Sequence, residues 1–184
     1  MKRSLRRAGS GACVMLIVFA GLPGTGKTTI SRAVARALAA THLRIDIIEQ
    51  AIRDSGVPAG LVGASGYAVA QALAGAHLGD GRIVVADCVN PVAASREGWR
   101  AVADRASVRL VEVEVACPDT REHRRRVEGR VSDIPGLVLP SWEAVMGGHY
   151  EPWDRARLVI DSAASSPSEA VGAVLGIVAQ DDPA

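Results

Sequence analysis

The sequence predicts an α/β fold in which a parallel sheet of about five strands is covered by helices on both faces. Two observations favour this class. Apolar, β-prone segments alternate with segments of helical spacing from residue 13 to about residue 180. A glycine-rich turn joins the first strand candidate to the first helix candidate, as in sheets built from strand–helix–strand units. No internal repeat or linker divides residues 13–180, which indicates a single domain.

The turn from Gly21 to Thr28 spells G-x-x-x-x-G-K-T, the pattern of a nucleotide phosphate-binding loop. It follows an apolar strand candidate at 14–20 and precedes a helix candidate at 30–38. Its glycines let backbone N–H groups curl toward phosphate oxygens, and the helix N-terminus adds the positive end of its dipole. Lys27 can reach the β- and γ-phosphates, and the Thr28 hydroxyl can bind Mg²⁺.

One continuous segment is therefore predicted to bind ATP and Mg²⁺. Its nucleotide-binding residues are Gly21, Leu22, Pro23, Gly24, Thr25, Gly26, Lys27, Thr28 and Thr29. A glycine turn that binds nothing is disfavoured, because the motif, the strand and the helix are all present. A dinucleotide-binding fingerprint is excluded, because Thr29 stands where its third glycine belongs.

Charge and cysteine content exclude other classes. The 184 residues carry a formal net charge of +1, which does not favour a surface for long nucleic acids. Lys2 and Lys27 are the only lysines, so the Asn-Lys-x-Asp motif of GTPases is absent. The three cysteines, Cys13, Cys88 and Cys117, have no C-x-x-C spacing and indicate reduced core residues of a cytoplasmic protein.

The N-terminal segment imitates a signal peptide, because basic residues precede an apolar run. Export would remove the strand on which the phosphate loop depends. Residues 1–12 are therefore expected to form a disordered basic tail, and translation could also begin at Met15. No apolar run reaches the length of a membrane span, so no membrane partner is expected.

In the first half of the chain, punctuating residues set the element boundaries. A short strand ends at Asp46, and helical spacing then lasts until Gly56 and Pro58 interrupt it. A glycine-rich loop leads to a second helix, and four apolar residues then form a strand that ends at Asp87. In chain order these elements are a strand at 43–46, helices at 47–53 and 67–78, and a strand at 82–87.

In the second half, Asn90 and Pro91 open a helix. The strand that follows it alternates between apolar and polar residues, which places it nearer an edge of the sheet. Asp119 and Glu122 can form a capping box at the start of an arginine-rich helix. In chain order these elements are a helix at 90–106, a strand at 108–115, helices at 120–130 and 141–147, a strand at 157–161 and a helix at 167–179.

Asp87 occupies the position of a Walker B carboxylate. Ligands of open parallel sheets bind at the carboxyl ends of the strands, so Asp87 is expected to face the phosphate loop. It is a candidate Mg²⁺ ligand together with Thr28. An aspartate that only caps the next helix is the alternative.

Together these segments resemble the small P-loop kinases, an ATP-binding family related to adenylylsulfate, gluconate, chloramphenicol and polynucleotide 5′-hydroxyl kinases. The resemblance spans Met15 to Ala179 and implies a three-layer P-loop NTPase fold with an arginine-bearing lid around 119–135. It rests on the phosphate loop, Leu-Arg-Ile-Asp at 43–46, Val-Ala-Asp-x-Val-Asn-Pro at 85–91, the arginine-rich helix at 119–130, Tyr-Glu-Pro-Trp-Asp at 150–154 and Ile-Asp-Ser at 160–162.

The resemblance implies catalytic roles for single residues. Asp46 is expected to be the base that takes the proton of the acceptor hydroxyl, with helix capping as its alternative role. Arg126 and Arg130 share a helix face and are expected to close over the transferring phosphoryl group. Arg121 and Arg125 have the same spacing and remain a second possible pair.

The resemblance also implies binding roles. Asp87 is expected to hold Mg²⁺ through water, and Asn90 to help position the acceptor. Arg44 and Arg53 are expected to line the acceptor pocket. The aromatic residues Trp142, Trp153 and Tyr150 are expected mainly to pack, with contact to substrate or adenine as the alternative.

These features predict a Mg²⁺-dependent kinase that moves the γ-phosphoryl group of ATP to a hydroxyl of a small molecule or of a nucleic-acid end. The alternatives are a regulatory protein that binds or hydrolyses ATP, and an AAA-type ATPase, for which 184 residues leave little room. The acceptor has no readable code in the segments 44–78 and 131–153, which are expected to build its pocket.

Overall fold

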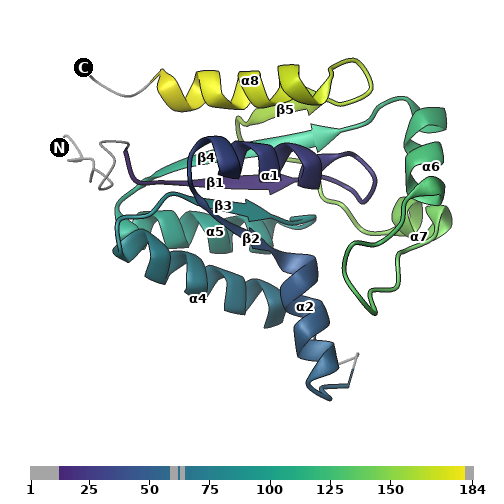
Figure 1. Ribbon diagram of the computed structural model, residues 1–184, viewed down its shortest axis with the longest axis horizontal. Helices are drawn as coiled ribbons and strands as arrows, with labels where there is room; N and C mark the ends of the chain where they lie inside the picture. The colour runs from purple at the N-terminus through teal and green to yellow at the C-terminus, as the bar shows by residue number, and fades with distance from the viewer. Residues whose placement is uncertain (1–12, 59–61, 63–64, 181–184) are drawn as a thin grey trace.

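The computed structural model describes residues 13–58, 62 and 65–180; the expected tail at 1–12 lies outside them. Five parallel strands form one sheet in the order β2-β3-β1-β4-β5 (Figure 1). The parallel sheet and its helical layers confirm the predicted fold class. The strands are β1 (Met15–Ala20), β2 (Thr41–Arg44), β3 (Val84–Asp87), β4 (Arg109–Ala116) and β5 (Leu158–Asp161).

Helices cover both faces of the sheet. Helices α1 and α8 lie on one face and α4 and α5 on the other, whereas α2, α6 and α7 stand beyond the carboxyl ends of the strands (Figure 1). The helices are α1 (Lys27–Ala37), α2 (Ile45–Asp54), α4 (Ser65–Gly79), α5 (Ala93–Ala106), α6 (Thr120–Gly129), α7 (Trp142–Gly147) and α8 (Pro167–Ala179).

Alternate residues of β1 feed two separate cores. Ile17 and Phe19 belong to the core under α1 and α8, whereas Leu16 and Val18 belong to the core under α4 and α5. Strand β1 is buried along its whole length, because it lies at the centre of a sheet covered on both faces. Strand β4 alternates between buried and half-buried residues and lies second from the sheet edge. Its position agrees with its alternating sequence.

The predicted strand at 43–46 is wrong at its carboxyl end. Strand β2 ends at Arg44, whose register partner is Asp87 at the end of β3, and α2 begins at the next residue. Ile45 and Ile48 are three positions apart, so in a helix they face the same core, and both pack there. Asp46 therefore lies in the first turn of α2 and not at the end of a strand.

Helix α6 begins at Thr120 as predicted but is capped differently, and α5 begins later than predicted. Asp119 accepts hydrogen bonds from the backbone N–H groups of Arg121 and Glu122, as expected of an N-cap. The Glu122 carboxylate, however, binds Arg125 and Arg126 at 2.7 Å each and does not complete a capping box. Helix α5 begins only at Ala93, with Val92 as its N-cap residue.

The buried cysteines agree with the sequence. Among the described residues, Cys13, Cys88 and Cys117 are buried and are not joined by disulfide bonds. In the part of the chain that the structure describes, none of the helices combines the length and apolar character needed to cross a bilayer.

Candidate active site

The phosphate loop joins β1 to α1 at the carboxyl edge of the sheet. Gly21, Gly24 and Gly26 have φ angles of +140°, +85° and +89°, a region that side chains disfavour. A Cβ atom at Gly21 would overlap the backbone carbonyl of Val115, and one at Gly24 would overlap the side chain of Val127. The loop can therefore keep this shape only with glycine at these positions.

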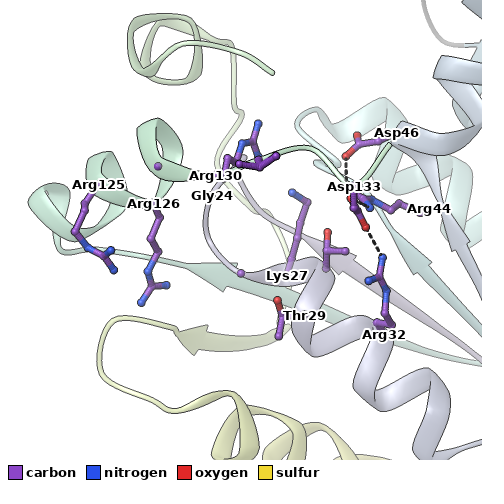
Figure 2. Close-up of a pocket in the computed structure, with 14 residues that line it drawn as sticks. Gly24, Lys27, Thr29, Arg32, Arg44, Asp46, Arg125, Arg126, Arg130 and Asp133 are labelled. Carbon is purple, nitrogen blue, oxygen red and sulfur yellow. Dashed lines mark hydrogen bonds and ion pairs between the residues drawn. The ribbon is translucent and has the colours of Figure 1, made fainter. Parts of the chain in front are cut away.

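Helix α1 offers its N-terminus to the same space. Gly26 is its N-cap residue, and no side chain caps the helix. Free N–H groups and the positive dipole end at such a terminus attract anions. Lys27, the first residue of α1, is largely buried and its Nζ lies 3.5 Å from the carbonyl oxygen of Leu22. Its ammonium group thus stays with the loop (Figure 2).

Asp87 provides an orphaned carboxylate beside the loop. It is 2% exposed and pairs in register with Phe19 near the end of β1. Neither carboxylate oxygen has a hydrogen-bond partner among the described residues, and Arg44 Nε lies 4.0 Å from one of them. A buried carboxylate normally binds a cation or several donors. Asp87 does not cap α5, whose N-cap is Val92.

The site fits Mg²⁺ bound together with phosphates. The Thr28 hydroxyl and the Asp87 carboxylate are oxygen groups of the kind that Mg²⁺ prefers. Across residues 13–58, 62 and 65–180, no three His, Cys, Asp or Glu side chains gather as a metal site. The remaining ligands of a bound Mg²⁺ would have to be phosphate oxygens and water, which is how this ion is usually held.

An ion-pair network joins the sheet, α1 and the segment after α6. Arg44 donates to Asp133 Oδ1 at 2.7 Å, and Arg32 of α1 donates to Asp133 Oδ2 at 2.9 Å. Arg44 also lies 3.6 Å from Asp46 Oδ2 (Figure 2). Hydrogen bonds from Arg32 and Arg44 lower the pKa of Asp133 to about 2. Asp133 is therefore an anion that anchors its loop over the site.

Asp46 stands at the start of α2 with its side chain 40% exposed. It does not cap this helix, whose N-cap residue is Arg44 and which has no side-chain cap. Its carboxylate is thus left available to a substrate, with Arg44 as its neighbour.

Helix α6 packs directly on the phosphate loop. His123 is buried and donates from Nε2 to the carbonyl oxygen of Pro23 at 2.9 Å, which requires the tautomer that carries the proton on Nε2. Val127 contacts the loop at Gly24. These contacts hold the arginines of α6 at the rim of the site.

The two arginines predicted to act in the lid both line the site. Arg126 is anchored by Glu122 at 2.7 Å and by the side chain and carbonyl of Ser162 at 3.0 Å each. Arg130 has a buried Nε without a hydrogen-bond partner in the described structure, and burial lowers its pKa while Asp46 opposes that shift. Arg125 also lines the site, but its side chain is 72% exposed. Arg121 does not line it.

Two cavities meet at this edge of the sheet. The phosphate-loop cavity, of about 460 Å³, is lined by residues 24 and 26–29, by Arg32, Arg44 and Asp46, and by 125–126, 129–131 and 133. The α2–α7 cavity, of about 310 Å³, is lined by Leu22 and Pro23, by Ile45, Asp46 and Glu49 of α2, by Ala144 and Val145 of α7, and by Tyr67, Val89, Pro91, Pro140, Gly148 and His149. Among the described residues, Asp46 alone lines both cavities.

Two predicted substrate residues lie outside both cavities. Arg53 pairs with Glu49 at 3.2 Å and lines neither space. Asn90 is fully buried and has a φ angle of +53°, and its backbone N–H donates to Tyr67 Oη at 2.8 Å. Its side-chain amide has no hydrogen-bond partner within the described structure.

The aromatic residues make packing contacts, but Trp142 and Tyr150 also line a further cavity of about 320 Å³ beside Leu22, so contact to a ligand stays the alternative. Trp153 stacks on the Arg96 guanidinium at 4.3 Å, and Trp142 meets the His123 ring edge-on at 5.2 Å. Tyr150 donates to Glu114 at 3.1 Å.

Sequence reasoning missed Arg32, Glu49, Tyr67 and Asp133 as residues of the site. Arg32 lies on the polar face of the predicted helix at 30–38, which is typical of a solvent-exposed arginine, and Asp133 has no motif around it. The bonds from Asp133 to Arg32 and Arg44 span 101 and 89 residues, so no local pattern could reveal them. Glu49 lies one helical turn after Asp46, and that spacing was the one available signal.

Comparisons with known proteins agree with this architecture. A family model described as "AAA domain" matches residues 16–146. A search of curated proteins gives no significant match. Among solved structures, the chain is similar to the APS kinase CysC of Mycobacterium tuberculosis in complex with AMPPNP and APS. The two are 19% identical, with 95% of this chain and 99% of that chain covered and a TM-score of 0.67.

Two further structures are similar over most of their length. A gluconokinase from Sinorhizobium meliloti 1021 is 22% identical, with 89% of this chain and 91% of that chain covered and a TM-score of 0.62. Kti12 of Chaetomium thermophilum, in complex with ADP-AlF3, is 21% identical, with 89% and 99% covered and a TM-score of 0.64. At these identities the similarity shows a shared fold.

Proposed function

Because the chain belongs to the AAA domain family and has the fold of small P-loop kinases, we propose that it is an ATP-dependent phosphotransferase. It moves the γ-phosphoryl group of ATP to a hydroxyl group of a small molecule. The structures of similar proteins hold AMPPNP with APS in one case and ADP-AlF3 in another. The proposal requires a nucleotide site and an acceptor site that adjoin each other.

The position of Asp46 carries the proposal. Its carboxylate borders both the phosphate-loop cavity and the α2–α7 cavity. A base for phosphoryl transfer must contact the acceptor hydroxyl while that hydroxyl faces the γ-phosphate. Asp46 lines both cavities, which supports its assignment as this base.

The proposed transfer is a single displacement. The acceptor hydroxyl oxygen attacks the γ-phosphorus, and the bond from this phosphorus to the bridging oxygen of the β-phosphate breaks. The electron pair of that bond leaves with ADP, and the hydroxyl proton passes to the Asp46 carboxylate. Lys27, Arg126 and Arg130 supply positive charge to the transferring group from the loop and from the lid.

Mg²⁺, when bound, neutralises charge on the β- and γ-phosphate oxygens. Thr28 and Asp87 are the residues that would hold it, Asp87 through water. The orphaned, buried carboxylate of Asp87 supports this role.

Asp46→Asn tests the proposal and keeps the shape of the side chain while removing its basicity. We expect phosphoester formation, followed by ³¹P NMR over a panel of hydroxyl compounds with ATP and Mg²⁺, to fall by at least about 100-fold. ATP affinity should not fall, because the change removes a carboxylate, and no cation, from the lining of the phosphate-loop cavity. Asp54→Asn, at the exposed far end of α2, is the matched control and should keep full activity.

If the Asp46→Asn variant still transfers the phosphoryl group at the original rate, Asp46 is not the base. Release of inorganic phosphate without any phosphoester, in the original protein, would favour the alternative of a regulatory ATPase or an AAA-type ATPase.

A further inference from the structure

The two cavities that meet at Asp46 differ sharply in charge. The phosphate-loop cavity is lined by six cationic side chains. They are Lys27, Arg32, Arg44, Arg125, Arg126 and Arg130. The described lining of the α2–α7 cavity contains no lysine or arginine. The cationic side chains that can bind anions are thus concentrated around the phosphate-loop cavity.

The walls of the α2–α7 cavity are mainly apolar. They are formed by side chains from α2, from the loops after β1 and β3, and from α7 and the segment before it, among them Ile45, Val89, Pro91, Pro140, Ala144 and Val145. Its volume of about 310 Å³ lies at the lower end of the range of roughly 300–1,000 Å³ for pockets that bind small molecules. The cavity therefore suits a small molecule with an apolar body.

Apart from His149 at the rim, the polar groups of this cavity are acidic or uncharged. Asp46 and Glu49 contribute carboxylates, and the partner of Glu49, Arg53, lies outside the lining. The Tyr67 hydroxyl accepts a hydrogen bond from the backbone of Asn90 at 2.8 Å. Burial raises the pKa of Tyr67, so this hydroxyl stays neutral near pH 7. His149 is exposed at the rim and lies 3.3 Å from Glu151.

These walls disfavour an anionic acceptor. A carboxylate or phosphate buried here would lose its hydration without gaining a lysine or arginine partner, and that loss is unfavourable. The carboxylates of Asp46 and Glu49 would add repulsion. An uncharged body meets neither penalty and gains from the apolar contact.

We propose that the α2–α7 cavity binds the phosphoryl acceptor, and that this acceptor is a small alcohol with an uncharged, largely apolar body. The inference rests on the proposed transferase function. The acceptor's hydroxyl lies at Asp46, the side chain common to both cavities, and Glu49 accepts a hydrogen bond from a polar group on the body.

Isosteric pairs of alcohols test the proposal. The probes are para-(hydroxyethyl)benzamide and para-(hydroxyethyl)benzoate, with the same amide and carboxylate pair on naphthalene and cyclohexane frames. Binding to the full chain with AMPPNP and Mg²⁺ is titrated by ligand-observed NMR, and transfer from ATP is followed by ³¹P NMR. We expect the amides to bind at least tenfold more tightly than the carboxylates. Equal or tighter binding of the carboxylates, or no binding of any amide, overturns the proposal.

Variants at Ala144 locate the binding. Ala144 is an exposed residue of α7 that lines the cavity, so Ala144→Trp should abolish amide binding and leave AMPPNP binding intact. Ala144→Arg should narrow or reverse the preference for the amides, because it adds the missing cation. Ala173→Trp, at an exposed position of α8, is the control and should change neither. Amide binding that persists unchanged in both Ala144 variants overturns the assignment.

The binding and transfer readouts separate the two proposals. Amide binding that Ala144→Trp abolishes, without a phosphoester from any bound amide, supports the neutral ligand class of the cavity and refutes the transferase function. Phosphoester formation from the carboxylates alone supports the transferase function and refutes the acceptor class.

Discussion

At the scale of single residues, the glycines of the phosphate loop are the most constrained positions of the site. Gly21 has a φ angle of +140°, and its Cα faces the carbonyl of Val115 so closely that a Cβ atom would overlap it. Both the torsion and the overlap oppose any side chain. The backbone geometry of these glycines is therefore needed for the shape of the loop, in addition to side-chain contacts such as that of His123 with Pro23.

Gly21→Ala is expected to lower the free energy of unfolding by at least about 2 kcal/mol. A non-glycine residue in such a region costs about 1–3 kcal/mol, and displacement of the Val115 carbonyl adds to this. Urea denaturation measures the change. Gly75→Ala, on α4 where nothing lies within 4 Å of the added methyl group, should instead raise stability by up to about 1 kcal/mol. Equal stability of the two variants would contradict the argument.

At this scale, sequence patterns predict only those site residues that lie close together in the sequence. The phosphate loop is readable because its glycines, Lys27 and Thr28 stand at fixed local spacing. Asp87 is readable because a carboxylate at the end of an apolar strand has a known place in parallel sheets. The hydrogen bonds of Asp133 to Arg32 and Arg44 form between elements that are far apart in the sequence. No pattern of residues near Asp133 predicts them.

At the scale of elements, α6 and the residue that follows it place Arg126 and Arg130 at the phosphate-loop cavity, where we propose that they act as a lid. Arg126→Ala and Arg130→Ala are each expected to lower kcat by at least about tenfold and to change KM for ATP much less, because both are proposed to stabilise the transferring phosphoryl group. Steady-state kinetics with an identified acceptor measure this. Arg124→Ala is the control, since Arg124 pairs with Glu128 at 2.7 Å and lines neither cavity. Unchanged kcat in both test variants would move the role to Arg125.

The ion pairs that join Asp133 to Arg32 and Arg44 should titrate at low pH. The pKa of Asp133 is lowered from 3.8 to about 2, so its ion pairs stabilise the folded chain above about pH 4 and fade as the pH falls toward 2. Asp133→Asn should thus reduce stability by less than about 1 kcal/mol near pH 6, because the side chain is half-exposed. Urea denaturation over this pH range measures the difference between the two proteins. A difference that does not shrink in acid would contradict the assignment.

The start of α2 shows where element prediction failed. Residues 43–48 are rich in isoleucine, which favours strands, and a short apolar run does not distinguish strand from helix. The helix forms because Ile45 and Ile48 pack on the core side that α4 covers. This tertiary contact decides the conformation, and it also turns Asp46 toward both cavities.

At the scale of the whole molecule, one buried arginine connects distant loops. Arg96 of α5 is fully buried and donates to the carbonyl oxygens of Asn90, Pro91, Glu151 and Pro152 at 2.6–3.2 Å. Its guanidinium also stacks on Trp153. The segments that border the α2–α7 cavity are thereby held against α5.

Arg96→Met is expected to lower the free energy of unfolding by about 3 kcal/mol or more. Methionine keeps much of the volume but leaves the buried carbonyl groups without donors. Thermal or urea unfolding measures the loss. Arg105→Met, at an exposed position of the same helix, should stay within about 0.5 kcal/mol of the original protein. A loss as small as that of the control would show that water replaces the guanidinium.

The alternation of strands and helices was enough to predict the parallel sheet and its two helical layers. The strand order was not predictable, because it depends on which strands pair across the sheet. The two cavities were not predictable either, since the α2–α7 cavity joins side chains from Leu22 to His149. Only the folded chain shows that they share Asp46.

The phosphate-loop cavity and the α2–α7 cavity share only Asp46 among their described lining residues. This separation has a consequence for how the sequence can change in evolution. Substitutions on α7 and in the loops around Pro91 and Pro140 alter the wall of the α2–α7 cavity and leave the residues that line the phosphate-loop cavity unchanged. Under the proposed function, a descendant of this chain can therefore change its acceptor while the residues of the phosphate-loop cavity stay the same. Asp46, which lines both cavities, is the residue that such a descendant must keep.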